Sequence, residues 1–277
     1  MSLTQAILPV AGLGTRFLPW TKVVPKELLP IGNEPIIALL VDECLSVGIT
    51  DICFVISHGK EAIPQYFYED PALEAELNQR GKGEALQELT KYDEVNFHIV
   101  YQMQQRGDGH ALLQAGKWVK SPSIAILFGD DLIVGEKNGL QQLDEAYGHL
   151  CAATAPEHLP ALLCLQNVPK SLVSKYGIVD ISPEESTGRL KRVRGLVEKP
   201  SPVSAPSTLG IVGKYIVPKT TFDVLPTVQG GTGGEIRLID ALITQLDSIA
   251  VYGYEFEGKR YDTGSPEGYK EAVRDLG

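Results

Sequence analysis

The chain has 277 residues, of which 43% are apolar and 22% are charged, and its formal net charge at pH 7 is −10. A chain of this length can bury a full core. The acidic balance argues against a general nucleic-acid or membrane-surface binder, because phosphate polymers attract basic faces. No run approaches the roughly 20 apolar residues of a membrane helix, and the sequence does not open with a basic and then apolar leader. We therefore expect a cytoplasmic protein.

The first half of the chain alternates between strand and helix patterns. Apolar runs predict strands at residues 6–10, 51–57, 95–101 and 124–128. An apolar face that starts near Pro35 predicts a helix, a polar stretch over 60–92 predicts a solvated helical insertion, and a short helix follows the third strand. Strands joined by helices through short links predict a parallel sheet that is covered on both faces.

The second half of the chain has a more mixed pattern. It predicts strands at residues 161–168, 174–179, 189–197, 209–217 and 249–256, and helices near 219–225, at 235–246 and at the end of the chain. We find no repeat, no low-complexity tract and no long linker. The expected fold class is α/β: one domain over residues 1–277, with a Rossmann-like mixed, mainly parallel sheet flanked by helices and a smaller lobe.

The loop after the first strand has the composition of a phosphate site. It carries two glycines, Gly12 and Gly14, and three cations, Arg16, Lys22 and Lys26. Glycines let backbone N–H groups approach an anion, and the cations neutralise it. The loop lacks the residue order of a P-loop. A bulky phenylalanine at the third glycine position of the G-x-G-x-x-G fingerprint argues against a dinucleotide site.

Three polar loops are expected at one edge of the sheet, at residues 11–27, 102–110 and 129–131. Each follows the carboxyl end of a predicted strand, which is where such sheets bind ligands. Asp130 directly follows an apolar strand, so its carboxylate is a candidate ligand of Mg²⁺, an ion that prefers oxygen ligands and phosphate; a solvated strand end is the alternative. Asp131 would point the other way on an extended strand.

Two further candidate groups are left open by the residues alone. Asp262 would be a second metal carboxylate only if the turn at 258–264 returns to the same edge of the sheet. Glu198 could accept hydrogen bonds from sugar hydroxyls while Lys199 binds a phosphate, but most Glu-Lys pairs at strand ends are simply exposed. The four cysteines and five histidines lack the spacing of a metal site, so we expect buried reduced thiols and no structural zinc.

Taken together, these motifs resemble those of the bacterial UTP–glucose-1-phosphate uridylyltransferases, also called UDP-glucose pyrophosphorylases, within the sugar-nucleotidyltransferase superfamily. The resemblance covers essentially the whole chain, and its first stretch is the most specific. The matching stretches are residues 10–19 (VAGLGTRFLP), 21–22 (TK), 25–30 (PKELLP), 109–111 (GHA), 197–200 (VEKP), 233–236 (GGEI) and 261–264 (YDTG). The implied fold is the nucleotide-diphospho-sugar transferase fold, with a nucleotide-binding half at 1–135 and a sugar-phosphate-binding half at 136–277.

The resemblance implies a Mg²⁺-dependent transfer of UMP from UTP to glucose 1-phosphate by direct in-line attack, giving UDP-glucose and pyrophosphate. The residues that it implies for the nucleotide are Ala11, Gly12, Gly14, Glu27, Gln102 and Gly107. The implied catalytic residues, which include the triphosphate contacts, are Arg16, Lys22, Asp130 and Lys199. The sugar phosphate would be held by Gly177, Glu198 and Lys199, and Mg²⁺ by Asp130 and Asp262.

The chain also departs from the family pattern. Trp20 stands where the family commonly has alanine, and the loop beside the base is altered at 106–108. Asp131 stands where an apolar residue is more usual and would bring an extra negative charge near the metal. The alternatives are the same chemistry with dTTP or another hexose 1-phosphate, and a catalytically silent regulatory paralogue that binds sugar nucleotides. The likeness also suggests a homodimer or homotetramer.

Overall fold

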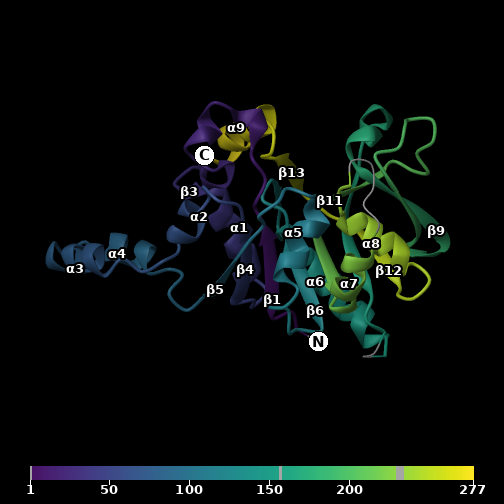
Figure 1. Cartoon of the computed structure of the whole chain (residues 1–277), viewed down its shortest axis with the longest axis horizontal. Coiled ribbons are helices and arrows are strands. Elements are labelled where there is room, and N and C mark those ends of the chain that lie inside the picture. The colour runs from purple at the N-terminus through teal and green to yellow at the C-terminus, as the bar shows by residue number, and fades with distance from the viewer. Residues whose placement is uncertain (1, 156–157, 229–233) are drawn as a thin grey trace.

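The computed structural model describes residues 2–155, 158–228 and 234–277, and these form a large central sheet with helices packed around it (Figure 1). The order of its nine strands is β5-β4-β1-β6-β11-β8-β12-β10-β9. The strands are β1 (Gln5–Pro9), β4 (Asp51–Ile56), β5 (Asn96–Tyr101), β6 (Ser123–Leu127), β8 (Ala161–Asn167), β9 (Gly177–Thr187), β10 (Leu190–Glu198), β11 (Leu209–Pro218) and β12 (Val251–Glu255).

The pairing changes character along the sheet. β1 pairs in parallel with β4 and β6, and β4 pairs in parallel with β5. β11 then runs antiparallel to both β6 and β8, and β10 runs antiparallel to β12 and β9, while β8 and β12 are parallel. The predicted α/β fold class with a mixed sheet is confirmed. The sheet is less parallel than expected, because its parallel pairings lie mostly in the N-terminal half and antiparallel pairings prevail in the C-terminal half.

Helices cover both faces of the sheet. They are α1 (Ile36–Leu45), α2 (Ala62–Gln65), α3 (Pro71–Gln79), α4 (Gly83–Leu89), α5 (Asp108–Ala115), α6 (Gly139–Ala152), α7 (Thr220–Val224), α8 (Leu238–Gln245) and α9 (Pro266–Leu276). Ala6 and Leu8 of β1 pack into one core with α1 and α6, whereas Ile7 packs into a second core with α5, α7 and α8. Successive side chains of a strand point to opposite faces, so β1 contributes to both cores.

Two short strand pairs lie outside the large sheet. β2 (Pro30–Ile31) pairs with β3 (Glu34–Pro35), just before α1. β7 (Asp131–Val134) pairs antiparallel with β13 (Lys259–Asp262), so that Asp262 lies opposite Asp131. The segment at 258–264, expected as a turn, therefore contains a strand that returns to the end of β6. The mostly polar residues of this segment gave no strand pattern in the sequence. Strand preference depends on the neighbouring strand and on burial, which the sequence does not show.

The polar stretch at 60–92 is a helical insertion, as predicted. It contains α2, α3 and α4, and α3 and α4 extend away from the rest of the molecule (Figure 1). No side chain of α3 or α4 is buried. None of the helices in the described ranges is long and apolar enough to span a bilayer.

Three further elements, besides β7 and β13, differ from the sequence prediction. α6 was not predicted, although Asn138 and Gln141 form a capping box at its start and carry the sequence signal of a helix N-terminus. α8 begins three residues later than expected, because the Ile236 N–H donates to the Arg106 carbonyl and the Leu238 N–H to Asp108 Oδ1. β9 extends eight residues past the predicted end at 179. Of the expected stretch at 233–236, Gly233 lies outside the described residues.

Candidate active site

A cleft of about 310 Å³ opens where the loops after β1, β5 and β6 meet. Among the residues that line it are six with predicted roles: Ala11, Gly12, Glu27, Gln102, Gly107 and Asp130. The cleft thus lies at the carboxyl edge of the parallel strands, where the three polar loops were expected to meet.

The loop at 102–110 is held in shape by glutamine side chains and a glycine. Gln102 Nε2 donates to the Gly107 carbonyl at 3.0 Å, and Gln105 Nε2 donates to the Ala11 carbonyl at 3.0 Å. Gly107 has a φ of +99°, and a Cβ atom there would lie 2.4 Å from the Ile236 carbonyl oxygen. A side chain at this position would be both strained and blocked, so the loop requires glycine.

Glu27 is held by a lysine that the sequence reasoning missed. Lys60, which follows β4, places Nζ 2.8 and 3.0 Å from the two carboxylate oxygens of Glu27 and 2.7 Å from the Val10 carbonyl. Both side chains are buried. Burial lowers the pKa of Lys60, although the charge of Glu27 opposes that shift. A lone lysine after a strand gave no sequence signal, because its partner lies 33 residues away.

The glycine loop winds through three short 3₁₀ turns, η1 (Thr15–Phe17), η2 (Trp20–Lys22) and η3 (Lys26–Leu28). Gly14 adopts a φ of +65° at the start of η1, and its carbonyl accepts a hydrogen bond from the Thr21 hydroxyl at 2.9 Å. Arg16 Nη1 donates to the Gly264 carbonyl at 3.3 Å, while Lys22 is exposed. The loop therefore brings Arg16 beside the β13 turn and leaves the Lys22 ammonium open to solvent.

Asp130 and Asp262 come together at Gly264, and we call these two residues the carboxylate pair. A Cβ atom at Gly264 would lie 2.7 Å from Asp130 Oδ2 and 3.1 Å from Asp262 Oδ1, so glycine leaves room for both groups. Thr263 N–H donates to the Asp130 carbonyl at 2.9 Å and fixes the turn. The question that the sequence left open has an answer: the turn does return to this edge of the sheet.

Lys26 contacts the carboxylate pair and was not among the predicted site residues, although its charge was noted. Its Nζ lies 2.9 Å from Asp130 Oδ2. Burial, the largest single influence, would raise the pKa of Asp130, but the charge and hydrogen bond of Lys26, together with the charges of Arg260 and Arg16, lower that pKa. Burial likewise opposes the charge on Lys26, but Asp130 and Glu27 outweigh it and raise its pKa. Both groups are therefore charged at neutral pH.

The environment of Asp131 differs from the prediction that this residue brings an extra negative charge near the metal. Asp131 does point away from Asp130, as predicted, but it is buried and neutralised. Its Oδ1 accepts from Arg260 Nε and its Oδ2 accepts from the Gly213 N–H at 2.7 Å. The charge of Asp131 is compensated inside the fold, because Arg260 on β13 lies against it.

Gly177, Glu198 and Lys199 are neighbours, and we call them the sugar turn. Glu198 lies opposite Gly177 in the pairing of β10 with β9, and a Cβ atom at Gly177 would lie 3.3 Å from Glu198 Oε2. Lys199 has a φ of +46°, which is uncommon for a residue with a side chain, and its Nζ lies 3.3 Å from Glu198 Oε1. These three residues do not line the cleft, but the charge of Glu198, after burial, helps to raise the pKa of Asp108, which does.

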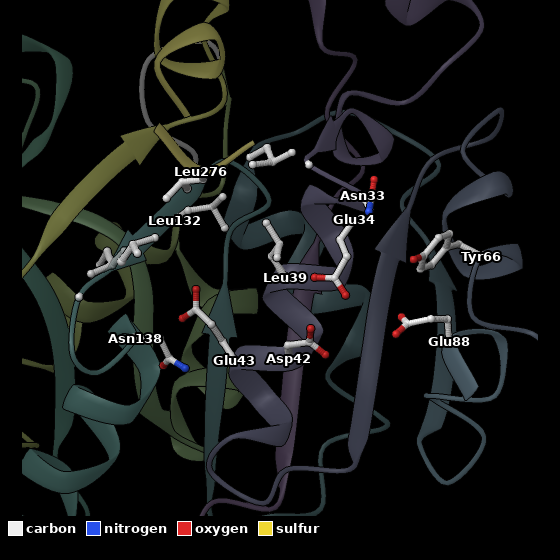
Figure 2. Close-up of a pocket in the computed structure, with 15 residues that line it drawn as sticks. Asn33, Glu34, Leu39, Asp42, Glu43, Tyr66, Glu88, Leu132, Asn138 and Leu276 are labelled. Atoms are coloured by element: carbon white, nitrogen blue, oxygen red, sulfur yellow. The ribbon is translucent and has the colours of Figure 1, made fainter. Parts of the chain in front are cut away.

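A larger hollow of about 920 Å³ lies between α1, β7 and the end of α9 (Figure 2). Three of its carboxylates already have cationic partners: Lys91 lies 2.7 Å from Glu34 and 2.8 Å from Asp42, and Lys214 lies 2.8 Å from Glu43. None of the predicted site residues, all of which are described, lines this hollow. The smaller cleft, which six of those residues line, is therefore the candidate active site.

Comparison with known proteins assigns the class. The family described as Nucleotidyl transferase matches residues 5–277. The chain therefore belongs to the nucleotidyl transferase family.

Relatives within that class include uridylyltransferases. The chain is 40% identical over 266 residues to the UTP–glucose-1-phosphate uridylyltransferase of Bacillus subtilis (strain 168), covering 96% of this chain and 88% of the relative. It is also 40% identical over 271 residues to the enzyme of that name from Staphylococcus haemolyticus (strain JCSC1435), with 96% and 90% covered. The resemblance to the bacterial UTP–glucose-1-phosphate uridylyltransferases is confirmed, and the chain is a nucleotidyltransferase enzyme of this kind.

Solved structures agree with this assignment. A UDP-glucose pyrophosphorylase complexed with UDP-glucose superposes with a TM-score of 0.86 at 32% identity, covering 99% of this chain and 98% of that one. A UTP-bound UGPase from Acinetobacter baumannii superposes with a TM-score of 0.88 at 35% identity, covering 99% and 93%. The predicted nucleotide-diphospho-sugar transferase fold is thus confirmed.

Proposed function

We propose that this enzyme transfers UMP from UTP to glucose 1-phosphate, giving UDP-glucose and pyrophosphate. The observation that carries the proposal is the meeting of Asp130 and Asp262 at Gly264, with Arg16 and Lys26 beside them, at the mouth of the cleft. The names of the relatives, which are 40% identical, supply the substrates. The named residues of the cleft and the sugar turn then take the following roles.

The base-binding side of the cleft would hold uracil. Polar groups from the loops after β1 and β5 line it, and they can donate to and accept from the imide edge of a pyrimidine. Backbone at Ala11 and Gly12, the Glu27 carboxylate, Gln102 and backbone at Gly107 are the contacts that we assign. Gly14, with its left-handed backbone, shapes the loop that would follow the triphosphate.

Arg16 and Lys22 would bind the triphosphate. The guanidinium of Arg16 lies at the β13 turn and can bind phosphate oxygens through two parallel N–H groups. Lys22 is exposed, and among the described residues it has no carboxylate within salt-bridge distance. A cation without a partner inside the protein is available for the charge of the α-phosphate region.

The carboxylate pair fits Mg²⁺. Two carboxylates converge where the absence of a side chain at Gly264 leaves space, and hard carboxylate oxygens together with phosphate are the ligands that Mg²⁺ prefers. When bound, Mg²⁺ would neutralise phosphate charge and favour departure of pyrophosphate. Lys26 is hydrogen-bonded to Asp130 in this structure. When the phosphates are bound, its ammonium group would turn toward them.

The sugar turn would hold glucose 1-phosphate. The Glu198 carboxylate can accept from two sugar hydroxyl groups, and Gly177 beside it leaves room for the ring. Lys199 would bind the sugar's phosphate as a point charge. Its positive φ holds the ammonium next to Glu198, and backbone strain of this kind is often found at ligand sites.

The proposed reaction requires no general base. A phosphate oxygen of glucose 1-phosphate is already a nucleophile at neutral pH, and it would attack the α-phosphorus of UTP in line. A new P–O bond forms as the α–β bridging P–O bond breaks, and pyrophosphate leaves. Catalysis then consists of positioning and charge neutralisation by Arg16, Lys22 and Lys199.

A pyrophosphorolysis panel tests this function. Purified enzyme is given pyrophosphate and Mg²⁺ with UDP-glucose, dTDP-glucose or UDP-galactose, and formation of nucleoside triphosphate is measured. We expect UTP from UDP-glucose at the highest kcat/KM. A higher value for dTDP-glucose or UDP-galactose would favour the alternative base or hexose. Tight binding by calorimetry without any product would favour the silent regulatory paralogue, which the presence of Arg16, Lys22, Asp130, Lys199 and Asp262 argues against.

The wider expectations remain part of the proposal. We propose a single domain over residues 1–277, with residues 1–135 as its nucleotide-binding half and 136–277 as its sugar-phosphate-binding half. We also propose a homodimer or homotetramer located in the cytoplasm, with no nucleic-acid or membrane partner. Light scattering measures the oligomeric state, and cell fractionation measures the location.

A further inference from the structure

Arg260 is a buried cation for which the proposed function has no role. It lies on β13, two residues before Asp262, and about one tenth of its side chain is exposed. Its Nε donates to Asp131, and its Nη1 donates to the Tyr176 hydroxyl at 3.2 Å and to Gln166 Oε1 at 3.3 Å. One guanidinium group on β13 therefore joins Asp131 of β7 to the stretch that carries Gln166 and Tyr176.

The two ends of this network adjoin the two parts of the active site. At one end, Asp131 is the neighbour of Asp130, and the strand that carries Arg260 also carries Asp262. At the other end, Tyr176 directly precedes the sugar turn, and its carbonyl accepts from the Lys199 N–H at 3.0 Å. The network therefore connects the carboxylate pair to the sugar turn.

The geometry of the network suits a spacer. The Arg260 guanidinium stacks over the Tyr176 ring, 5.5 Å from its centroid, while its N–H groups make the hydrogen bonds. A guanidinium is planar and rigid, so bonds from its two sides fix the angle and the distance between its partners. Asp131 also accepts from the Gly213 N–H of β11, which ties the same network to the large sheet.

We propose that Arg260 is a positioning residue for the transfer reaction, which sets the sugar turn at a fixed distance from the carboxylate pair through Tyr176 and Asp131. This inference rests on the proposed function. In-line transfer depends on the distance between the attacking phosphate oxygen and the α-phosphorus, and small displacements reduce the rate strongly. Arg260 forms its side-chain hydrogen bonds with Asp131, Gln166 and Tyr176 and not with the carboxylate pair or the predicted sugar contacts, so it would position the sugar turn through these partners.

Tyr176→Phe is the main test, because it removes one hydroxyl and keeps the ring and the Arg260–Asp131 pair. We expect the KM for glucose 1-phosphate to rise roughly threefold to tenfold, the range for loss of one hydrogen bond, while the KM for UTP stays unchanged. Calorimetry provides a readout besides turnover: affinity for UDP-glucose falls by the same factor, and affinity for UTP does not. The melting temperature is recorded in parallel.

Arg260→Lys is the second variant, since it keeps a cation beside Asp131 but loses the rigid fork. We expect the same selective rise in the KM for glucose 1-phosphate, with a lower kcat. Arg192→Met is the matched control: Arg192 also stacks on a tyrosine, Tyr252 at 5.2 Å, and pairs with Glu185. None of these control partners is a predicted site residue, so both KM values should stay unchanged.

The outcomes separate the inference from the proposed function. A wild-type enzyme that makes no UDP-glucose contradicts both. An active wild type whose Tyr176→Phe and Arg260→Lys variants keep the wild-type KM for glucose 1-phosphate contradicts the positioning role alone. An equal rise in both KM values, or the same change in Arg192→Met, would show a general structural role and also overturn the inference.

Discussion

The two sides of the cleft differ in how firmly their functional groups are held. On the base side, Glu27 is buried against Lys60, and Gln102 and Gln105 are hydrogen-bonded to backbone carbonyls. On the triphosphate side, the glycine loop carries Lys22 exposed, together with the exposed apolar residues Leu13, Leu18, Trp20 and Val23.

Under the proposed function, this difference would separate recognition of the base from neutralisation of the phosphate charge. A rigid polar surface can discriminate one base from another, because a mismatched base would leave buried groups unpaired. An exposed cation would instead suit a triphosphate, whose charge moves from the α-phosphorus to the departing pyrophosphate during the proposed reaction. Substitutions on the base side should therefore affect stability as well as binding, and substitutions on the triphosphate side should affect the rate alone.

The largest effect is expected from Asp130→Ala. Loss of this carboxylate removes one of the two proposed Mg²⁺ ligands and the partner of Lys26. UDP-glucose formation should fall on the order of 10³-fold or more, while the melting temperature changes little, because the side chain is partly exposed. Asp180→Ala, which removes a half-buried aspartate paired with Arg194, is the control. Turnover near the wild-type rate would contradict the site assignment.

The next effect, on stability, is expected from Lys60→Met. The substitution leaves the Glu27 carboxylate buried without its cation, which should lower the free energy of unfolding by about 3–5 kcal/mol. Urea unfolding measures this loss. The double variant Lys60→Met/Glu27→Gln should recover part of it, since the buried charge is then gone. A double variant no more stable than the single one would mean that Lys60 acts mainly through the Val10 carbonyl.

Lys22→Ala tests the proposed triphosphate side of the cleft, where Lys22 is exposed. The rate of UDP-glucose formation should fall on the order of 10²–10³-fold, with the free energy of unfolding unchanged within about 0.5 kcal/mol, the usual range for a surface substitution. Lys82→Ala, which removes an exposed lysine from the α3–α4 insertion, is the control and should change neither quantity. A clear stability loss in Lys22→Ala would contradict the prediction that only substitutions on the base side affect stability.

The smallest effect concerns His110, whose Nδ1 lies 3.1 Å from Gln102 Nε2. Burial, and then the charge of Arg106, lower the pKa of His110 below its ordinary 6.5. The folded protein thus resists protonation, and the stability that neutral His110 contributes is complete above pH 6.5 and is lost as the pH falls through its folded pKa. Urea unfolding at pH 7.5 and 5.5 should show a smaller loss for His110→Gln than for the wild type. Equal losses would contradict this role.

Much of the cleft lining could be predicted from the sequence, because its residues follow apolar strands. Ala11, Gln102 and Asp130 each come at or just after the end of a parallel strand, and the rule for ligand sites in such sheets places them together. The position of Asp262 could not be predicted in this way. It depends on the pairing of β13 with β7, two short strands more than 120 residues apart in the chain.

The residues that the sequence reasoning missed share one property: each acts through a distant partner. The role of Lys60 depends on its ion pair with Glu27. The role of Arg260 depends on its hydrogen bonds to Asp131 and Tyr176. A local motif can reveal a loop that binds a ligand, because the loop's own backbone does the binding. A local motif cannot reveal a buried ion pair, because folding brings together two residues that are far apart in the sequence.

The exposed indole of Trp20 gives this enzyme an optical signal on the triphosphate loop. The chain has two tryptophans, and Trp118 stacks on His98 at 5.9 Å, away from the cleft. Emission from an indole shifts with the polarity around it, so the Trp20 signal would report any change in the surroundings of the glycine loop, with Trp118 as an internal reference. A loop that lacked this tryptophan would need an attached dye to be followed in real time.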